Sequence, residues 1–136
     1  IPTLGICLGM QGIVHSFGGK IIHAKEPMHG KISFLLHDEK GIYKKIPQNI
    51  EIMRYHSLIV ELETLPDCFV INGISQENDN DNNILEIKQI TPKCEIMAIS
   101  HKIYPIYGIQ FHPESFGSEG GIEILQNFLF KDNGAE

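Results

Sequence analysis

The stretch GICLGMQ, residues 5–11, places a cysteine between two glycines at the junction of two hydrophobic patterns. Residues 1–6 are mostly apolar and predict the end of a buried strand. From residue 10 to residue 17 the apolar side chains recur at helical spacing, until two glycines end the pattern. Cys7 therefore lies on a turn that leads from a strand into a helix.

The turn around Cys7 predicts a nucleophile elbow in which sulfur replaces oxygen. So sharp a turn forces strained dihedral angles on its central residue and brings neighbouring chain close, so we expect small residues to be needed at Gly5 and Gly9. Near a helix N-terminus, the helix dipole and the free backbone N–H groups favour thiolate over thiol. The alternative is that Cys7 is a small buried hydrophobic residue, as free cysteines often are.

The composition is typical of one soluble globular domain. The chain has 136 residues, of which 42% are hydrophobic and 21% charged, and its formal net charge is −6. This charge argues against nucleic acid or a membrane as partner, because both would require a concentrated basic surface. Three cysteines without a C-x-x-C pair indicate a reducing compartment, so we expect a cytoplasmic or organellar protein with no metal site.

The middle of the chain predicts strands rather than helices. The polar segment SQENDNDNN, residues 75–83, predicts a solvated hairpin loop, with an acidic metal-binding loop as the less favoured alternative. A terminal helix is predicted over residues 121–131, packing on the sheet through a stripe of Ile122, Leu125, Phe128 and Leu129. Short segments rich in strand-forming residues predict strands over 31–37, 50–55, 57–61, 68–72, 84–90, 95–100 and 106–111.

The stretch QFHPES, residues 110–115, follows the last predicted strand. His112 and Glu114 are two residues apart, so in extended chain their side chains point to the same side. Pro113 fixes its own φ and biases His112 toward extended conformations. Such a pair suits a base and a carboxylate that orients it, which a thiol nucleophile requires. The alternative is a surface His–Glu pair at a strand end.

Residues 5–11 together with Phe111–Glu114 resemble the class I glutamine amidotransferases, which use a Cys-His-Glu triad. The stretches His29–Ser33 and Arg54–Leu58 narrow this resemblance to the branch that supplies ammonia to chorismate-aminating synthases, for anthranilate or for aminodeoxychorismate. The resemblance extends from residue 1 to about residue 130.

The resemblance implies a role for each matching residue. Cys7 would attack the side-chain carbonyl of glutamine, and His112 would protonate the departing ammonia. Glu114 would orient His112, and the backbone N–H of Leu8 would be the first oxyanion donor. Residues expected to contact the substrate are Leu8, Gln11, Ser57 and Leu58, although the last three could instead be ordinary helix or strand residues. No role is assigned to His29, and Cys68 and Cys94 are expected to be core residues.

The implied fold is α/β, flavodoxin-like, with a mixed, largely parallel sheet flanked by helices and the active site at the carboxyl ends of strands. We expect residues 1–136 to form the C-terminal portion of a glutamine amidotransferase domain. The reason is that the predicted nucleophile strand begins at residue 1, leaving no sequence to supply neighbouring strands or a second oxyanion donor.

The implied partners are glutamine as substrate and a chorismate-aminating synthase subunit or domain as acceptor of the ammonia, with no cofactor in this domain. Two other protein classes are alternatives: a cysteine hydrolase of the α/β-hydrolase type, and a non-catalytic module with the same fold. The hydrolase is disfavoured because its acid would precede the histidine in the chain, whereas Glu114 follows His112. The non-catalytic module is disfavoured because all three triad residues are present.

Overall fold

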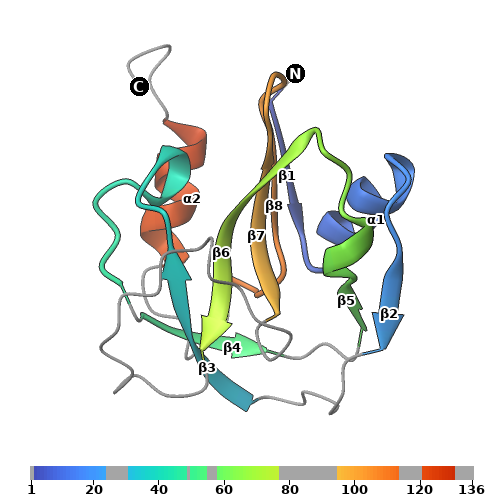
Figure 1. Cartoon of the computed structure of the whole chain (residues 1–136). Helices are drawn as coiled ribbons and strands as arrows, with labels where there is room; N and C mark the ends of the chain where they lie inside the picture. The colour runs from blue at the N-terminus through green and yellow to red at the C-terminus, as the bar shows by residue number, and fades with distance from the viewer. Residues whose placement is uncertain are drawn as a thin grey trace.

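The computed structural model describes residues 2–23, 31–48, 50–54, 58–76, 95–113 and 121–130. Within these ranges the chain forms one six-stranded sheet, one two-stranded sheet, two α-helices and two short 3-10 helices (Figure 1). In chain order the elements are β1 (Thr3–Ile6), α1 (Leu8–Ser16), β2 (Ile21–His23), β3 (Lys31–His37), η1 (Gly41–Tyr43), β4 (Ile50–Arg54), β5 (Leu58–Val60), η2 (Leu62–Thr64), β6 (Phe69–Gln76), β7 (Ile96–His101), β8 (Ile106–Ile109) and α2 (Gly121–Leu129).

The larger sheet has the strand order β1-β8-β7-β6-β3-β4. Strands β1 and β8 are parallel, with Ile6 opposite Ile109, whereas the other four neighbouring pairs are antiparallel. The expectation of a mixed sheet is confirmed, but that of a largely parallel one is wrong for the described residues. The physical reason is visible between β7 and β8: residues 102–105 are too short for the crossover that a parallel pair needs.

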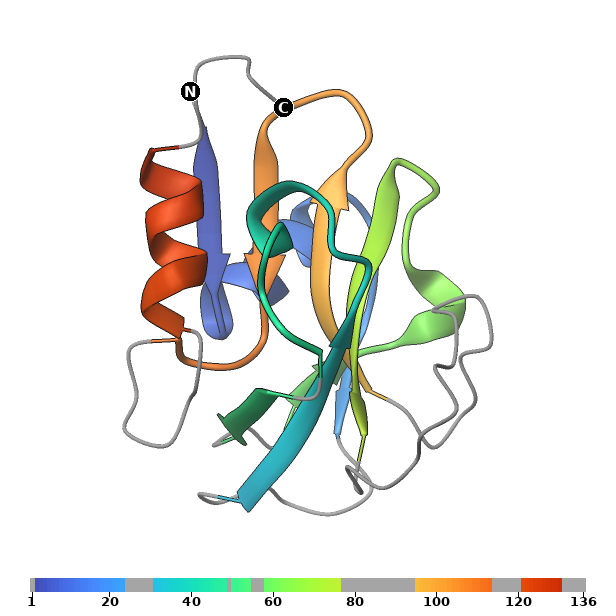
Figure 2. The ribbon, with the colours of Figure 1, turned by 90° about the vertical axis from the view of Figure 1, so that its left-hand side faces the viewer.

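The two α-helices lie on opposite sides of the larger sheet (Figures 1 and 2). On one side, Met10 and Val14 of α1 pack with Phe69 and Ile99. On the other side, Ile124 of α2 belongs to a core that also contains buried residues of η1 and of strands β3, β4, β7 and β8. The sheet is therefore covered on both faces, as the α/β expectation requires.

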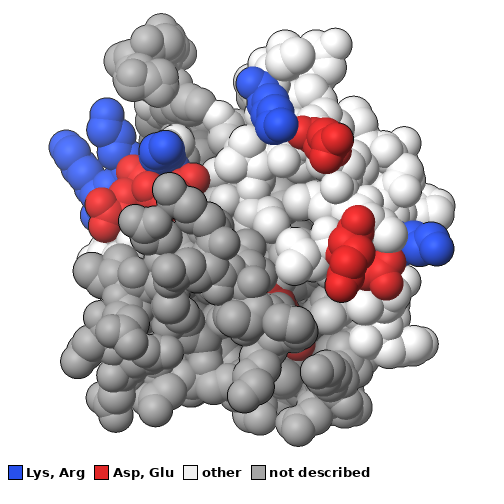
Figure 3. Space-filling model, viewed as in Figure 1, with Lys and Arg blue, Asp and Glu red and all other residues white. Residues whose placement is uncertain are grey.

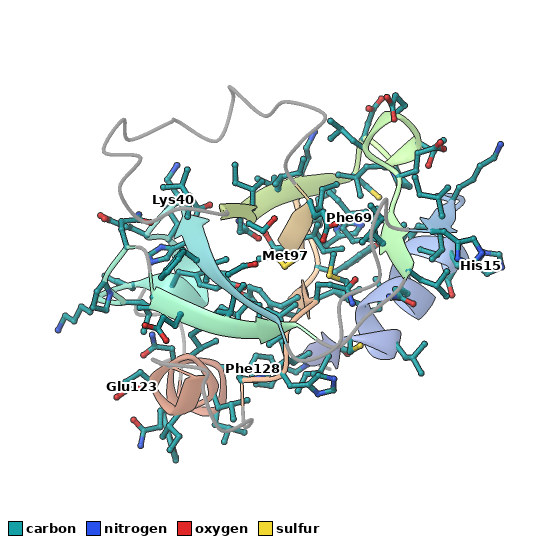
Figure 4. The ribbon with its side chains drawn as sticks, turned by 90° about the horizontal axis from the view of Figure 1, so that it is seen from below. His15, Lys40, Phe69, Met97, Glu123 and Phe128 are labelled. Atoms are coloured by element: carbon teal, nitrogen blue, oxygen red, sulfur yellow. The ribbon has the colours of Figure 1, made fainter. Side chains whose placement is uncertain are left out.

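The buried face of α2 differs from the predicted stripe. Ile124 is fully buried and Phe128 packs against the core, whereas Ile122 and Leu129 are 64% and 67% exposed. Phe128 lies on the sheet side of the helix, away from Glu123 (Figure 4). The side-chain amide of Asn127 donates to the backbone carbonyls of Ile42 and Lys44 at 2.8 and 3.1 Å, which fixes the rotation of the helix about its axis.

The predicted strands that fall on described residues are confirmed to within a few residues at their ends. One correction concerns Ser75 and Gln76, which were predicted to open a loop but extend β6, where they pair with β3. A strand that the sequence pattern did not predict is β2, which pairs antiparallel with β5. The rest of the predicted loop, the strand over 84–90 and Cys94 lie outside the described residues.

Candidate active site

Cys7 lies between the end of β1 and the start of α1, with φ 56° and ψ −106°. A positive φ is disfavoured for any residue with a Cβ, so this backbone is strained. Two hydrogen bonds hold it: the N–H of Cys7 donates to the carbonyl of Ile109 at 2.8 Å, and the N–H of Gln11 donates to the carbonyl of Cys7 at 3.1 Å. The predicted strand, strained turn and helix are confirmed.

Close packing around the turn requires glycine at two positions. A Cβ on Gly5 would lie 2.7 Å from the backbone carbon of Gly9 and 2.7 Å from the side chain of Ile13. A Cβ on Gly108 of β8 would lie 2.9 Å from the side chain of Met10, so this glycine lets α1 approach the strand. The expectation for Gly9 is wrong among the described residues, because a Cβ there would have no described atom within 4 Å.

Parallel pairing of β1 with β8 brings Cys7 and His112 to the same end of the sheet. The backbone N–H of Cys7 donates a hydrogen bond to the carbonyl of Ile109, the last residue of β8. His112 follows Ile109 by three residues. His112 is half-buried between the buried residues Phe111 and Pro113. Glu114 and Ser57 lie outside the described residues, so their predicted roles stay predictions.

The chain after His112 is also held by α2. A Cβ on Gly121, the first residue of that helix, would collide with the carbonyl of Pro113, so helix and loop backbone are in direct contact. The glycine is therefore required by packing, and the sequence pattern did not indicate this.

Two buried glutamines connect Cys7 to β5 through hydrogen bonds. Gln110 is fully buried, and its Nε2 donates to Sγ of Cys7 at 3.6 Å. Gln11 is 5% exposed, and its Nε2 donates to Oε1 of Gln110 at 3.2 Å and to the carbonyl of Leu58 at 3.1 Å. Gln11 and Leu58, both predicted to bind substrate, are thus in contact, whereas Leu8 is 73% exposed at the start of α1.

Sequence reasoning missed Gln110. The available signal was a polar residue between the apolar residues Ile109 and Phe111, at the end of a buried strand. A buried amide needs hydrogen-bond partners, so its position next to the predicted catalytic histidine could have indicated a role in the site.

A second buried polar cluster lies at the opposite end of the sheet, around a pocket of about 370 Å³. There Asn72 donates from Nδ2 to Oδ2 of Asp38 at 2.8 Å. Oδ1 of Asn72 and the hydroxyl of Tyr43 are buried without a hydrogen-bond partner among the described residues. Burial, and then the charge of Asp38, raises the pKa of Tyr43 well above its usual range.

On the face shown in Figure 3, described Lys and Arg side chains lie beside Asp and Glu side chains. Across the part of the chain that the structure describes, no group of three or more His, Cys, Asp and Glu residues could hold a metal ion. None of the described helices is long and apolar enough to cross a membrane.

The family model "Glutamine amidotransferase class-I" matches residues 1–132. The chain belongs to this family. It is 43% identical over 129 residues to anthranilate synthase component 2 of Azospirillum brasilense and 47% identical over 130 residues to that of Cyanophora paradoxa, covering 95% of this chain in each case. It is 38% identical over 131 residues to aminodeoxychorismate synthase component 2 of Escherichia coli, covering 96% of this chain.

Solved structures share the fold of this class-I amidotransferase. A Thermoplasma acidophilum protein assigned as a component of GMP synthase is 29% identical and superimposes with a TM-score of 0.74, over 94% of this chain and 55% of that one. A glutamine amidotransferase from Thermotoga maritima, 18% identical, superimposes with a TM-score of 0.62 over 93% of this chain and 45% of that one. The chain spans 58%, 60% and 62% of the lengths of the three relatives named above.

Proposed function

We propose that the chain acts as a glutaminase that hydrolyses glutamine through Cys7, His112 and Glu114 and delivers the ammonia to a chorismate-aminating synthase. The observation that carries this proposal is the strained backbone of Cys7, which presents a thiol at the end of the sheet where His112 also lies. Relatives that are components of anthranilate and aminodeoxychorismate synthases support the proposal.

The proposed reaction begins when His112 takes the proton of the Cys7 thiol and Sγ attacks the side-chain carbonyl carbon of glutamine, which forms a tetrahedral intermediate. The backbone N–H of Leu8, which follows the nucleophile at the start of α1, donates to the oxyanion. His112 gives a proton to the amide nitrogen as the C–N bond breaks, so ammonia departs and a γ-glutamyl thioester remains. Water, deprotonated by His112, then attacks the thioester and releases glutamate and the thiol.

The remaining predicted residues position these groups. Glu114 orients His112 and stabilises the imidazolium form. Gln11, Ser57 and Leu58 hold the substrate glutamine. Ammonia is largely protonated near neutral pH, and its ammonium form is no nucleophile, so direct delivery to the synthase preserves its reactivity.

Anthranilate is the favoured product of the assembled enzyme. Relatives that are anthranilate synthase components are 38% to 47% identical to this chain, and the Escherichia coli aminodeoxychorismate synthase component is 38% identical. Incubating the native complex with chorismate and glutamine and identifying the product by mass spectrometry tests this choice. Aminodeoxychorismate as the sole product would assign the chain to the alternative pathway.

The Cys7→Ala variant tests the nucleophile in the native complex with its synthase. We expect glutamine-dependent synthesis to fall by on the order of a thousand-fold or more, while synthesis from added ammonium is retained, because ammonium bypasses the glutaminase. The matched control is Cys68→Ala, a half-buried free cysteine outside the site, which should leave both activities unchanged. Equal loss of both activities in Cys7→Ala would show that the residue supports the fold or the interface instead.

A further inference from the structure

We propose that Gln110 is a further catalytic residue, which holds Cys7 as a thiolate by donating a hydrogen bond from its side-chain amide to Sγ. This inference rests on the proposed function in one respect, that Cys7 is the nucleophile.

The position of Gln110 is fixed independently of its side chain. Its backbone N–H donates to the carbonyl of Met97 at 2.8 Å, which continues the pairing of β8 with β7 beyond the last residue of the strand. The side chain is fully buried and reaches Cys7, with Nε2 at 3.6 Å from Sγ, within the range of an N–H···S hydrogen bond. A buried side chain held by the sheet can present its amide to the sulfur with little loss of entropy.

The carbonyl of Leu58 determines the direction of this hydrogen bond, because it fixes the orientation of Gln11, which in turn fixes that of Gln110. The carbonyl oxygen of Leu58 can only accept, so the group of Gln11 that lies 3.1 Å from it must be the NH₂. The same NH₂ lies 3.2 Å from the side chain of Gln110, so the atom of Gln110 that faces it must be the oxygen. The NH₂ of Gln110 is then the group that faces Cys7.

Reversing either amide would place like groups against each other, two donors if Gln110 alone is reversed and two acceptors if Gln11 is reversed. With Gln110 reversed, its NH₂ would need the oxygen of Gln11 as acceptor, and that oxygen would then face the carbonyl of Leu58. Buried acceptors without donors are costly, so the arrangement has one favourable polarity. The backbone of β5 therefore determines which end of Gln110 meets the nucleophile.

This polarity favours the thiolate. An amide NH₂ is a donor with no capacity to accept the thiol proton, so its hydrogen bond is stronger to S⁻ than to S–H. A hydrogen bond to the charged form of an acid lowers its pKa. Gln110 thus supplies reactive thiolate before substrate arrives, and His112 is left to carry the proton to the leaving ammonia.

The test measures the rate at which iodoacetamide alkylates Cys7 as a function of pH, read by peptide mass spectrometry in the complete native polypeptide that carries these residues. In Gln110→Met, which keeps a similar shape and removes the donor, we expect the midpoint of alkylation to rise by about one pH unit. Cys68, alkylated in the same sample, is the internal control, and its profile should not move. An unshifted midpoint for Cys7 would overturn the inference.

Glutamine turnover provides a second readout. We expect Gln110→Met to lower kcat by roughly ten-fold at neutral pH with little change in KM, and to recover partly at higher pH, where more thiolate forms without help. A merely structural role would give a loss that does not depend on pH. Should Gln110→Met fail to fold, Gln11→Met decides instead: it removes the group that orients Gln110, so a smaller upward shift of the Cys7 midpoint is expected, and no shift overturns the inference.

The alkylation experiment also separates this inference from the proposed function. A wild-type complex that hydrolyses no glutamine would overturn the proposed function, while the pH profile of Cys7 would still decide the role of Gln110. A wild-type complex that hydrolyses glutamine, combined with an unshifted midpoint, would overturn the role of Gln110 alone.

Discussion

The two ends of the larger sheet each hold a buried polar cluster, and the clusters differ in how their hydrogen bonds are satisfied. At the carboxyl end of β1, Cys7, Gln110 and Gln11 form a continuous series of donors and acceptors that ends at a backbone carbonyl. At the other end, Asn72 and Tyr43 each bury an oxygen that has no partner among the described residues.

The two clusters therefore differ in how strictly the orientation of each polar group is determined. At the proposed catalytic end, each amide is fixed in orientation by its neighbour, so a single donor points at the sulfur. At the other end the fold retains unpaired buried oxygens, each of which costs roughly 1–3 kcal/mol in lost solvation. Substitutions at the first cluster should therefore change chemistry, and substitutions at the second should change stability alone.

Among substitutions that disturb packing rather than remove a proposed reacting group, the largest effect is expected from Gly5→Ala, at the end of the sheet that holds Cys7. The added methyl would meet the backbone of Gly9 and the side chain of Ile13 at 2.7 Å, so the turn that presents Cys7 must shift. We expect glutamine hydrolysis to fall by on the order of a hundred-fold and the free energy of unfolding to fall by about 2–3 kcal/mol.

Gly12→Ala is the matched control for this change. Gly12 lies on the exposed side of α1, and its Cβ would meet no described atom within 4 Å. Alanine in a helix should raise stability by up to about 1 kcal/mol and leave turnover unchanged. Equal activity of the two variants would mean that the turn is not held by close packing at Gly5.

An effect on stability alone, without the loss of activity expected for Gly5→Ala, is expected from Asn72→Asp. The new carboxylate would replace the amide that donates to Asp38 at 2.8 Å, so two negative charges would share a partly buried site. At neutral pH we expect the free energy of unfolding, measured by urea denaturation, to fall by about 2–4 kcal/mol. Activity of the folded protein should stay within about two-fold of wild type, because the site is at the other end of the sheet.

The pH dependence of the stability of Asn72→Asp shows whether charge repulsion causes the loss. Repulsion raises the folded-state pKa of the carboxyl pair above the unfolded value, so the loss of stability grows as pH rises above about 4 and is relieved below it. Asn72→Ala loses the hydrogen bond without adding charge, so its loss should be nearly independent of pH. A pH-independent loss in both variants would exclude charge repulsion.

The smallest effect is expected from Tyr43→Phe, which removes one of the unpaired oxygens. At neutral pH we expect the free energy of unfolding to be unchanged or higher by up to about 1 kcal/mol. The exposed Tyr104 offers a matched control, because Tyr104→Phe removes a hydroxyl that solvent reaches. A loss of stability in Tyr43→Phe beyond that of the control would show that the buried hydroxyl has a partner.

The free energy of unfolding at alkaline pH gives a second test of the burial of Tyr43. Because the folded-state pKa of Tyr43 is raised by burial and by Asp38, the unfolded chain loses this proton first, at about pH 10. The stability of the wild type should therefore fall above about pH 10, by up to about 1.4 kcal/mol per pH unit from this group. Tyr43→Phe should flatten that fall.

Structural features that depend on a short stretch of sequence were predicted. The apolar run, the glycine before Cys7 and the helical spacing after it predicted the strained turn, because strand, turn and helix are encoded within about fifteen residues. Most strands of the middle segment were predicted for the same reason, since strand-forming side chains and short turns are local signals. The position of His112 just beyond the last strand was predicted in the same way, from the apolar run that precedes it and from the proline that follows it.

Features that depend on distant contacts were not predicted. The antiparallel majority in the sheet depends on which strands meet, and the buried face of α2 depends on Asn127 bonding to carbonyls that are 83 and 85 residues away in the chain. Gln110 could be assigned a partner only once β1 lay beside β8. Each of these depends on pairings that no single stretch of sequence contains.

Selection for stability alone would not place a cysteine at residue 7. With φ 56° and ψ −106°, the residue occupies a conformation that glycine adopts freely and that costs other residues on the order of 1–3 kcal/mol. A lineage that no longer needed the thiol would gain folding free energy by a single substitution to glycine, so drift would remove the cysteine early. Under the proposed function, the thiol is kept at this position against the preference of its own backbone, so reactivity and stability oppose each other there.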